Sequence, residues 1–255
     1  MYAVLALLAA GEDGPARRGL TWLRARQLPD GGWPPQTGFD ESNWVTALAA
    51  MIPPEHLGAR AHGRAIEWLL STVGEETTLV FRLRRWLLGE PTRLSNGVGW
   101  PWVRGTAAWV VPTSLAVLAL EKEYLRNRDR DIRSRVASGR SFLLERMCLN
   151  GGWNHGSLRV YGVDGLPYPE TTGIALAAIR GVPGPSTDKS VAVALTFLRD
   201  CRSADSLNWL RMGLMAHGKL PLDYRAPALA CRTVPETSVG MLVAETQKGR
   251  EIFWG

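Results

Sequence analysis

Two stretches of the chain end a helix-like run in the same way, with two glycines and a tryptophan: QLPDGGW at 27–33 and MCLNGGW at 147–153. When they are aligned on this ending, residues 18–33 and 138–153 also share a glycine and an aromatic residue followed by leucine. Weaker copies begin at Arg64 and Val193, but their sequences do not continue into the Gly-Gly-Trp ending. Repetition of this kind predicts a series of equivalent helical units.

A second type of segment, apolar and rich in small residues, follows each copy. Three of these segments open with Pro-Thr or Pro-Glu-Thr, and Pro and Thr are favoured where a helix begins. Their composition leaves almost no polar face, which indicates helices buried on all sides. The segments are 3–11, 43–51, 110–123, 168–179, 208–218 and 234–245.

The repeat helices themselves are amphipathic, with arginines on their polar side, as in 132–147. Outer amphipathic helices alternating with inner apolar ones predict an all-α fold, an (α/α)6-type toroid or barrel. The glycine of each GGW turn supplies the left-handed residue that ends an outer helix. No linker divides the chain, so we expect one domain over residues 1–255; whether the ring closes within it is left open.

Composition limits the function classes. The formal net charge is +6, which permits anionic partners, but no nucleic-acid reader motif is present, and we expect no nucleic acid to bind. Three scattered cysteines favour a reducing, cytoplasmic location. The start, MYAVLALLAAGEDG, predicts a buried helix and not a signal peptide, and no stretch is long enough to span a bilayer. Peripheral membrane contact stays open, as does the oligomeric state.

The first repeat copy resembles a known motif. It is similar to the QW motif of squalene–hopene cyclases, oxidosqualene cyclases and related terpenoid cyclases at Arg18, Gly19, Trp22, Leu23, Gln27, Gly31 and Trp33. Residues 99–120 resemble a segment of bacterial prenyltransferase and squalene-oxidase-repeat proteins. The resemblance implies a toroid whose apolar hollow takes an isoprenoid or another lipid. Protein prenyltransferase β-subunits and complement thioester domains share this toroid, so the fold alone does not select a chemistry.

The resemblance also implies where an acid should stand. Class II terpenoid cyclases protonate an alkene or epoxide with an aspartic acid of a D-x-D-D motif that opens an inner helix, and this chain lacks the motif. Glu170 and Glu236 occupy the corresponding positions and are our candidate catalytic residues. The alternative is that both only stabilise a helix N-terminus. The Asp-x-Cys and histidine ligands of zinc prenyltransferases are not matched by Asp200-Cys201, so we predict no metal and no cofactor.

Aromatic residues near the starts of inner helices could line a hollow, because aromatic faces attract carbocations. Trp44, Trp109, Tyr168 and Trp209 are candidates for this role, with packing in the walls as an equal alternative. Asp164 is either a polar residue at the rim or a turn residue.

Arginines gather in RLRRW (82–86) and LRNRDRDIRSR (125–135). Such runs suit a diphosphate or an anionic membrane surface, although a solvated outer face is the simpler interpretation. Two functions remain: an enzyme that processes an isoprenoid, as a cyclase (an isomerase) or a prenyltransferase-like protein, and a non-catalytic scaffold for a lipid or a protein partner.

Overall fold

The computed structural model describes residues 1–77, 87, 97–156, 159–160 and 163–250. Helices dominate, which confirms the all-α prediction. Strands occur in the described part of the chain as two short antiparallel pairs, β1 (Trp100–Pro101) with β2 (Ala108–Trp109) and β3 (Arg159–Val160) with β4 (Val163–Asp164).

The chain forms two compact units, which we call unit 1 (Met1–Trp22 with Arg146–Gly255) and unit 2 (Leu23–Glu145). The expectation of one domain over 1–255 stays a prediction.

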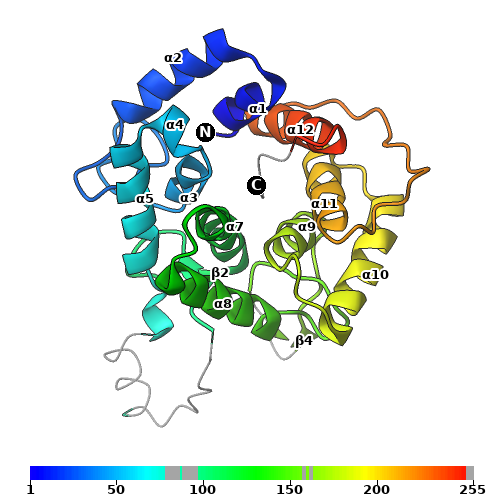
Figure 1. Cartoon of the computed structure of the whole chain (residues 1–255). Helices are drawn as coiled ribbons and strands as arrows, with labels where there is room; N and C mark the ends of the chain where they lie inside the picture. Colours follow the sequence, from blue (N-terminus) through cyan, green and yellow to red (C-terminus); the bar gives the residue numbers. More distant parts are fainter. Residues whose placement is uncertain (78–86, 88–96, 157–158, 161–162, 251–255) are drawn as a thin grey trace. The chain divides into compact units, whose positions relative to one another are not determined.

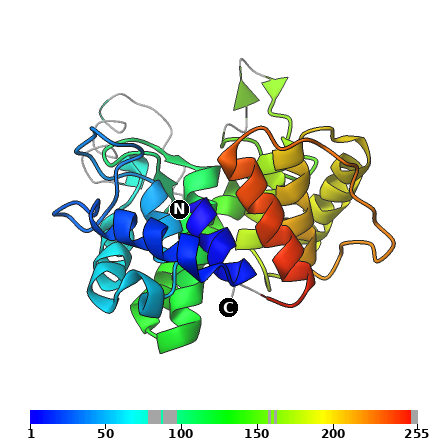
Figure 2. The same ribbon diagram turned by 90° about the horizontal axis from the view of Figure 1, so that it is seen from above.

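Unit 1 is built from six helices: α1 (Tyr2–Ala10), α2 (Asp13–Arg24, up to Trp22), α9 (Pro169–Ala178), α10 (Pro185–Asp200), α11 (Ala204–Ala216) and α12 (Val234–Gln247). Helix α11 packs against α9 and α12, and α12 packs against α1 (Figures 1 and 2). Helix α10 covers α9 and α11 from outside this row. Every residue of α9 from Thr171 to Ala178 is buried, as its apolar sequence predicts.

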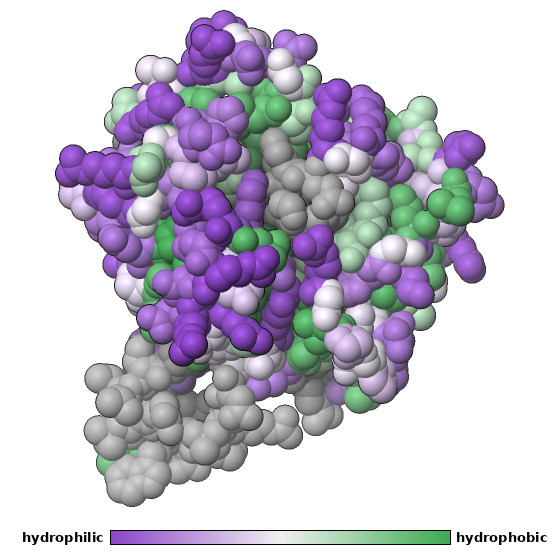
Figure 3. Space-filling model, in the orientation of Figure 1, coloured by the Kyte–Doolittle hydropathy of each residue, from purple (hydrophilic) through white to green (hydrophobic). Residues whose placement is uncertain are grey.

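Unit 2 repeats this layering with α3 (Val45–Ala50), α4 (Pro54–Leu57), α5 (Ala59–Ser71), a 3₁₀ turn (Glu75–Thr77), α7 (Val110–Asn127) and α8 (Arg130–Glu145). Helix α3 packs against α7, α5 covers both, and α8 covers α7. Hydrophilic residues predominate over α2, α5 and α8 in Figure 3. All six apolar segments predicted as inner helices therefore form helices, and amphipathic helices cover α3, α7, α9 and α11.

The two GGW turns have the same geometry. Gly31 and Gly151 take φ values of 95° and 94°, which only glycine adopts without strain. In the first turn the Leu28 N–H donates to the Gly32 carbonyl at 2.9 Å. In the second turn the Cys148 N–H donates to the Gly152 carbonyl, also at 2.9 Å. A Cβ on Gly31 would lie 2.6 Å from the carbonyl oxygen of Arg64, and one on Gly151 would lie 2.9 Å from that of Lys189. Each turn therefore ends one outer helix against the backbone of the next.

The repeat copy that begins at Arg64 has a tryptophan, Trp100, in the place of Trp33, which the sequence pattern did not show. In the first copy, the Trp33 backbone N–H bonds to Thr46 Oγ1 (3.0 Å), and its indole N–H bonds to a leucine carbonyl near the end of α2 (2.8 Å). Trp100 makes the same two bonds, to Thr113 Oγ1 (2.8 Å) and to a leucine carbonyl near the end of α5 (2.8 Å). A long insertion separates Trp100 from its helix, which hid it from the sequence pattern.

Gln27 joins the first GGW turn to the next outer helix. Its side-chain amide donates to the carbonyl of Gly31 within the turn (2.9 Å) and to that of Ala61 near the start of α5 (2.8 Å). The glutamine of the motif therefore holds the turn against α5.

The arginine run at 125–135 is only partly a solvated face. Arg135 turns inward, stacks on the Trp100 ring with its guanidinium carbon 3.3 Å from the centroid, and donates to the carbonyls of Val98 (2.5 Å) and Thr72 (3.0 Å). Burial lowers its pKa to about 9. The run 82–86 lies outside the described residues. Within the described residues, none of the helices has both the length and the hydropathy that a membrane span needs.

Candidate functional site

Three carboxylates stand in the first turns of three neighbouring helices of unit 1. Glu170 lies in α9, Asp205 in α11 and Glu236 in α12, and α11 packs against both of the other helices. The two candidate acids that the sequence indicated therefore flank a third that it did not. We call these three residues the acidic cluster.

Asp205 escaped the sequence analysis because α11 begins at Ala204 and not near 208. Ser203 is the N-cap, and its hydroxyl accepts a hydrogen bond from the Ser206 N–H at 3.4 Å. The signal was present, since a serine followed two residues later by an acidic residue is a common helix start. Trp209, expected at the beginning of the helix, instead lies in its second turn and is 3% exposed.

Two glycines bring α9 and α11 into backbone contact. A Cβ on Gly173 would lie 2.5 Å from the Leu210 nitrogen and closer still to the Trp209 carbonyl group. On the facing helix, a Cβ on Gly213 would lie 2.5 Å from the Gly173 carbonyl oxygen. Any larger side chain at these positions would hold the helices apart. This close approach allows the first turns of α9 and α11 to place their carboxylates near each other.

The surroundings of Asp205 raise the pKa of its carboxyl group. Burial raises the pKa of Asp205, and the negative charges of Glu170 and Glu236 raise it further, against a hydrogen bond from the Trp209 indole that lowers it. Asp205 therefore keeps its proton to a higher pH than an ordinary aspartic acid.

The flanking carboxylates have partners of their own. Glu170 Oε2 accepts a hydrogen bond from the Ser206 hydroxyl at 3.3 Å. Glu236 Oε2 accepts one from the backbone N–H of Arg232 at 2.6 Å, which closes the start of α12. The helix-stabilising role considered as an alternative in the sequence is therefore present for Glu236.

Aromatic rings border the Asp205 carboxyl group. Tyr2 of α1 meets Trp209 edge to face, with ring centroids 6.2 Å apart. Burial raises the pKa of Tyr2, and the negative charge of ionised Asp205 adds to the rise. A carboxylic acid with a raised pKa can donate a proton, and neighbouring aromatic rings can stabilise positive charge.

The other candidates lie elsewhere. Tyr168, the N-cap of α9, is 45% exposed and packs near the His155 ring at 5.3 Å. Asp164 is exposed on β4. Trp44 and Trp109 belong to unit 2, where Trp44 packs edge to face on Trp102 at 5.2 Å and Trp109 is 36% exposed just before α7. Their place in the wall of a hollow stays a prediction.

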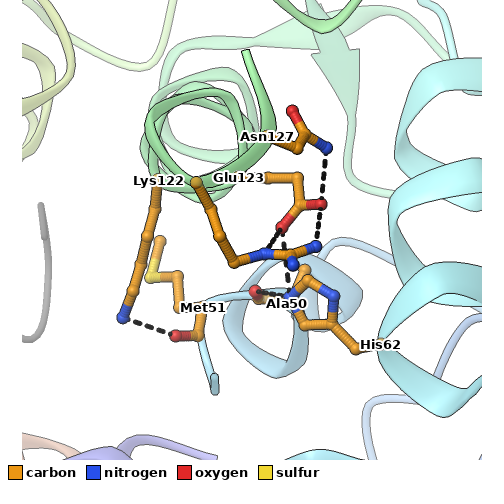
Figure 4. A network of polar contacts seen from close by, with 7 residues as sticks. Ala50, Met51, His62, Lys122, Glu123 and Asn127 are labelled. Atoms are coloured by element: carbon orange, nitrogen blue, oxygen red, sulfur yellow. Dashed lines mark hydrogen bonds and ion pairs between the residues drawn. The ribbon is translucent and has the colours of Figure 1, made fainter. Parts of the chain in front are cut away.

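A second polar cluster lies in unit 2 and was also missed (Figure 4). His62 of α5 contacts the Ala50 carbonyl through Nε2 at 3.1 Å, and Lys122 of α7 donates to the Met51 carbonyl at 3.0 Å. Both side chains therefore bind carbonyls at the C-terminal end of α3, which a helix leaves without partners. The cluster fastens the end of α3 to α5 and α7.

Glu123 of α7 is the acidic member of this second polar cluster. It is 6% exposed, accepts two hydrogen bonds from Arg126 (2.9 and 2.5 Å), and lies 3.9 Å from His62 Nε2. Burial lowers the pKa of His62, although Glu123 opposes the shift, and burial lowers the pKa of Lys122 to about 8. Because each polar group is already bonded to a neighbour, the geometry indicates a structural role.

Within the described residues, no three His, Cys, Asp or Glu side chains are grouped so that they could hold a metal ion. The acidic cluster is therefore not arranged as a metal site. Comparison with protein-family models and with curated proteins gave no match.

Proposed function

We propose that the chain is an α/α toroid of the terpenoid cyclase type that binds an isoprenoid or similar hydrophobic molecule and protonates it, with Asp205 as the acid. Three features support the toroid: the inner and outer helices of each unit, the matching GGW turns, and the third tryptophan turn at Trp100.

The raised pKa of Asp205 is the observation that carries the chemistry. Protonating an alkene requires a carboxylic acid that is still protonated when the substrate arrives, and neighbouring carboxylates keep it so. In the D-x-D-D motif one segment supplies those neighbours. Here three helix starts supply them, with Glu170 and Glu236 on either side of Asp205.

The proposed reaction needs no cofactor. The Asp205 proton forms a C–H bond with one alkene carbon, and the electrons of the double bond leave a cation on the other carbon. The rings of Trp209 and Tyr2 are the nearest described groups that could stabilise this cation. Loss of a proton to Glu170 or to water then restores a double bond. The product is an isomer of the substrate, cyclised where a second double bond attacks the cation.

A non-catalytic role is the second candidate, and the bond from the Arg232 N–H to Glu236 favours it. In this version the carboxylates stabilise helix starts, and the protein holds a hydrophobic ligand or a protein partner unchanged. A cytoplasmic location with peripheral membrane contact suits either version, since isoprenoids partition into membranes.

The test is an incubation of the full chain with squalene and with polyprenyl diphosphates in deuterated buffer, followed by mass spectrometry of the products. We expect isomers of the substrate that carry one deuterium. Asp205→Asn should lower turnover at least a hundredfold, since removing a positioned acid costs about 10² to 10⁴ in rate. Glu170→Gln should lower it less.

Asp188→Asn is the matched control, because Asp188 is a first-turn acid of the outer helix α10 and is exposed. Its turnover should equal that of the wild type. Full turnover in Asp205→Asn would remove this residue from the mechanism. Isoprenoid retained by both proteins in native mass spectrometry, without any product, would establish the binding role instead.

A further inference from the structure

A second place in unit 1 has the features of a ligand site, and the carboxylates of the acidic cluster do not line it. The segment between α11 and α12, residues 219–233, contains no helix or strand. A cavity of about 450 Å³ lies between this segment and the two helices. The volume falls within the range of about 300–1,000 Å³ that is typical of small-molecule pockets.

Both apolar and polar residues line this cavity. Met215, Leu220 and Leu222 supply much of the apolar wall. Tyr224, Arg225 and the α12 residues Thr246 and Gln247 supply the polar part. A neighbouring cavity of about 200 Å³ is lined by residues that include Arg211. No acidic residue lines either cavity.

Two buried polar atoms at this place have no hydrogen-bond partner among the described residues: Arg211 Nε and the Tyr224 hydroxyl. The terminal nitrogens of Arg211 donate to neutral acceptors, Gln247 Oε1 at 2.9 Å and Asn208 Oδ1 at 3.4 Å. Leaving a buried polar group unsatisfied is costly, so each such group needs an explanation, and a bound ion is one.

The electrostatics agree with an anion as that partner. Burial lowers the pKa of Arg211, and burial raises the pKa of Tyr224 while Arg211 partly offsets the rise. The nearest acidic residue along α12, Glu245, is already held by Lys248 (2.7 Å) and Arg250 (3.0 Å). Arg211 is thus a half-buried cation without a carboxylate partner.

We propose that the two cavities lined by this segment together bind a small amphiphile whose anionic head, a carboxylate or a phosphate, lies between Arg211 of the smaller cavity and Tyr224 of the larger one. The guanidinium Nε–H and the tyrosine hydroxyl donate to the head, and Arg225 at the exposed edge adds positive charge. The apolar chain of the ligand lies against Met215, Leu220 and Leu222. Because the acidic cluster would repel such a head, this site differs from the proposed acid site in its ligand chemistry.

The test is isothermal titration of the full chain with decanoate, decyl phosphate and decanol, which share a ten-carbon chain. The two anions should bind saturably, and decanol at least tenfold more weakly. Comparison of decanoate with decyl phosphate identifies the preferred head. Hydrogen exchange should slow at residues 219–233 when the anion is bound.

Arg211→Gln should weaken anion binding at least tenfold and leave decanol unchanged. Tyr224→Phe removes only a hydroxyl group without a partner, so it should fold normally and bind the anion several-fold more weakly. Arg199→Gln removes the same charge from an exposed position on α10 and is the matched control. Equal anion affinity in Arg211→Gln and Arg199→Gln, equal binding of decanol and decanoate, or no saturable binding would overturn the proposal. None of these results depends on turnover at Asp205.

Discussion

Gly173→Ala tests whether the contact between α9 and α11 builds the acidic cluster. The new Cβ would lie 2.5 Å from the Leu210 nitrogen, whereas ordinary van der Waals contacts lie at 3.4–4 Å. The obstacle is helix backbone, which cannot rotate away as a flexible side chain could. The two helices must therefore separate by about 1 Å where they touch.

The energetic result combines two terms of opposite sign. Overpacking a close contact costs about 1–3 kcal/mol and occasionally more, and here the strained atoms are backbone, so the upper end of that range applies. Replacing a glycine inside a helix by alanine recovers about 1 kcal/mol of helix propensity. We expect a net loss of about 2 kcal/mol in the free energy of unfolding, together with a smaller rise in the pKa of Asp205 as the carboxylates move apart.

Denaturant unfolding followed by circular dichroism measures the first effect. Gly14→Ala is the control, because Gly14 is a helical glycine of the same unit with nothing within 4 Å of its would-be Cβ. It should be neutral or stabilising by less than about 1 kcal/mol. If Gly173→Ala unfolds at the same denaturant concentration as Gly14→Ala, the backbone contact between α9 and α11 does not exist, and the geometry of the acidic cluster is wrong.

Three further predictions concern stability. Trp100→Phe should lower the free energy of unfolding by about 1–3 kcal/mol, and Trp33→Phe by a similar amount, because each removes the indole N–H that satisfies a buried carbonyl. Denaturant titration measures this loss. An effect of Trp100→Phe below about 0.5 kcal/mol would show that Trp100 does not close a third turn. Asp205→Asn should be more stable than the wild type at neutral pH. The folded state favours the protonated acid, so wild-type stability falls as the pH rises from the ordinary aspartate pKa of 3.8 through the raised pKa of Asp205. A stability difference between the two proteins that stays constant across pH 3–8 would contradict this. Burial lowers the pKa of Lys122 to about 8, below the ordinary lysine value of 10.5. The stability of the wild type relative to Lys122→Met should therefore rise by up to about 3 kcal/mol between pH 8 and 10.5. A stability difference that does not change over this pH range would contradict the buried position of Lys122.

The fold class and the six inner helices were predictable because their signals are local. Composition marks a buried helix, and a glycine with positive φ marks the end of an outer one. The third tryptophan turn was not predictable, because Trp100 reaches its leucine carbonyl across 31 residues of the chain. Arg135 was missed for a related reason: its position in a charged run indicates solvent, and only the tertiary structure shows the ring that it covers.

Two of the three residues of the acidic cluster were predicted from the sequence, and Asp205, the proposed acid, was not. Sequence position indicates Glu170 and Glu236, because each follows a proline at the start of an apolar helix. It gives no information on which carboxylates share a neighbourhood, since this depends on how closely α9 and α11 approach. The two glycines that permit the approach are ordinary members of small-residue helices in the sequence.

Two physical effects compete at Asp205, and their relative size bears on function. The positive end of a helix favours a carboxylate by about 0.3–1 kcal/mol, which would lower the pKa. Burial and two neighbouring negative charges act in the other direction, and each can exceed that amount where solvent is partly excluded. The pKa of Asp205 is raised, so the second set of effects prevails over the first. An uncharged residue at this position would avoid the cost of burying a charge, and Ser203 already caps the helix. A carboxylic acid whose pKa is raised by burial and by two neighbouring carboxylates agrees with the proposed role of Asp205 as a proton donor.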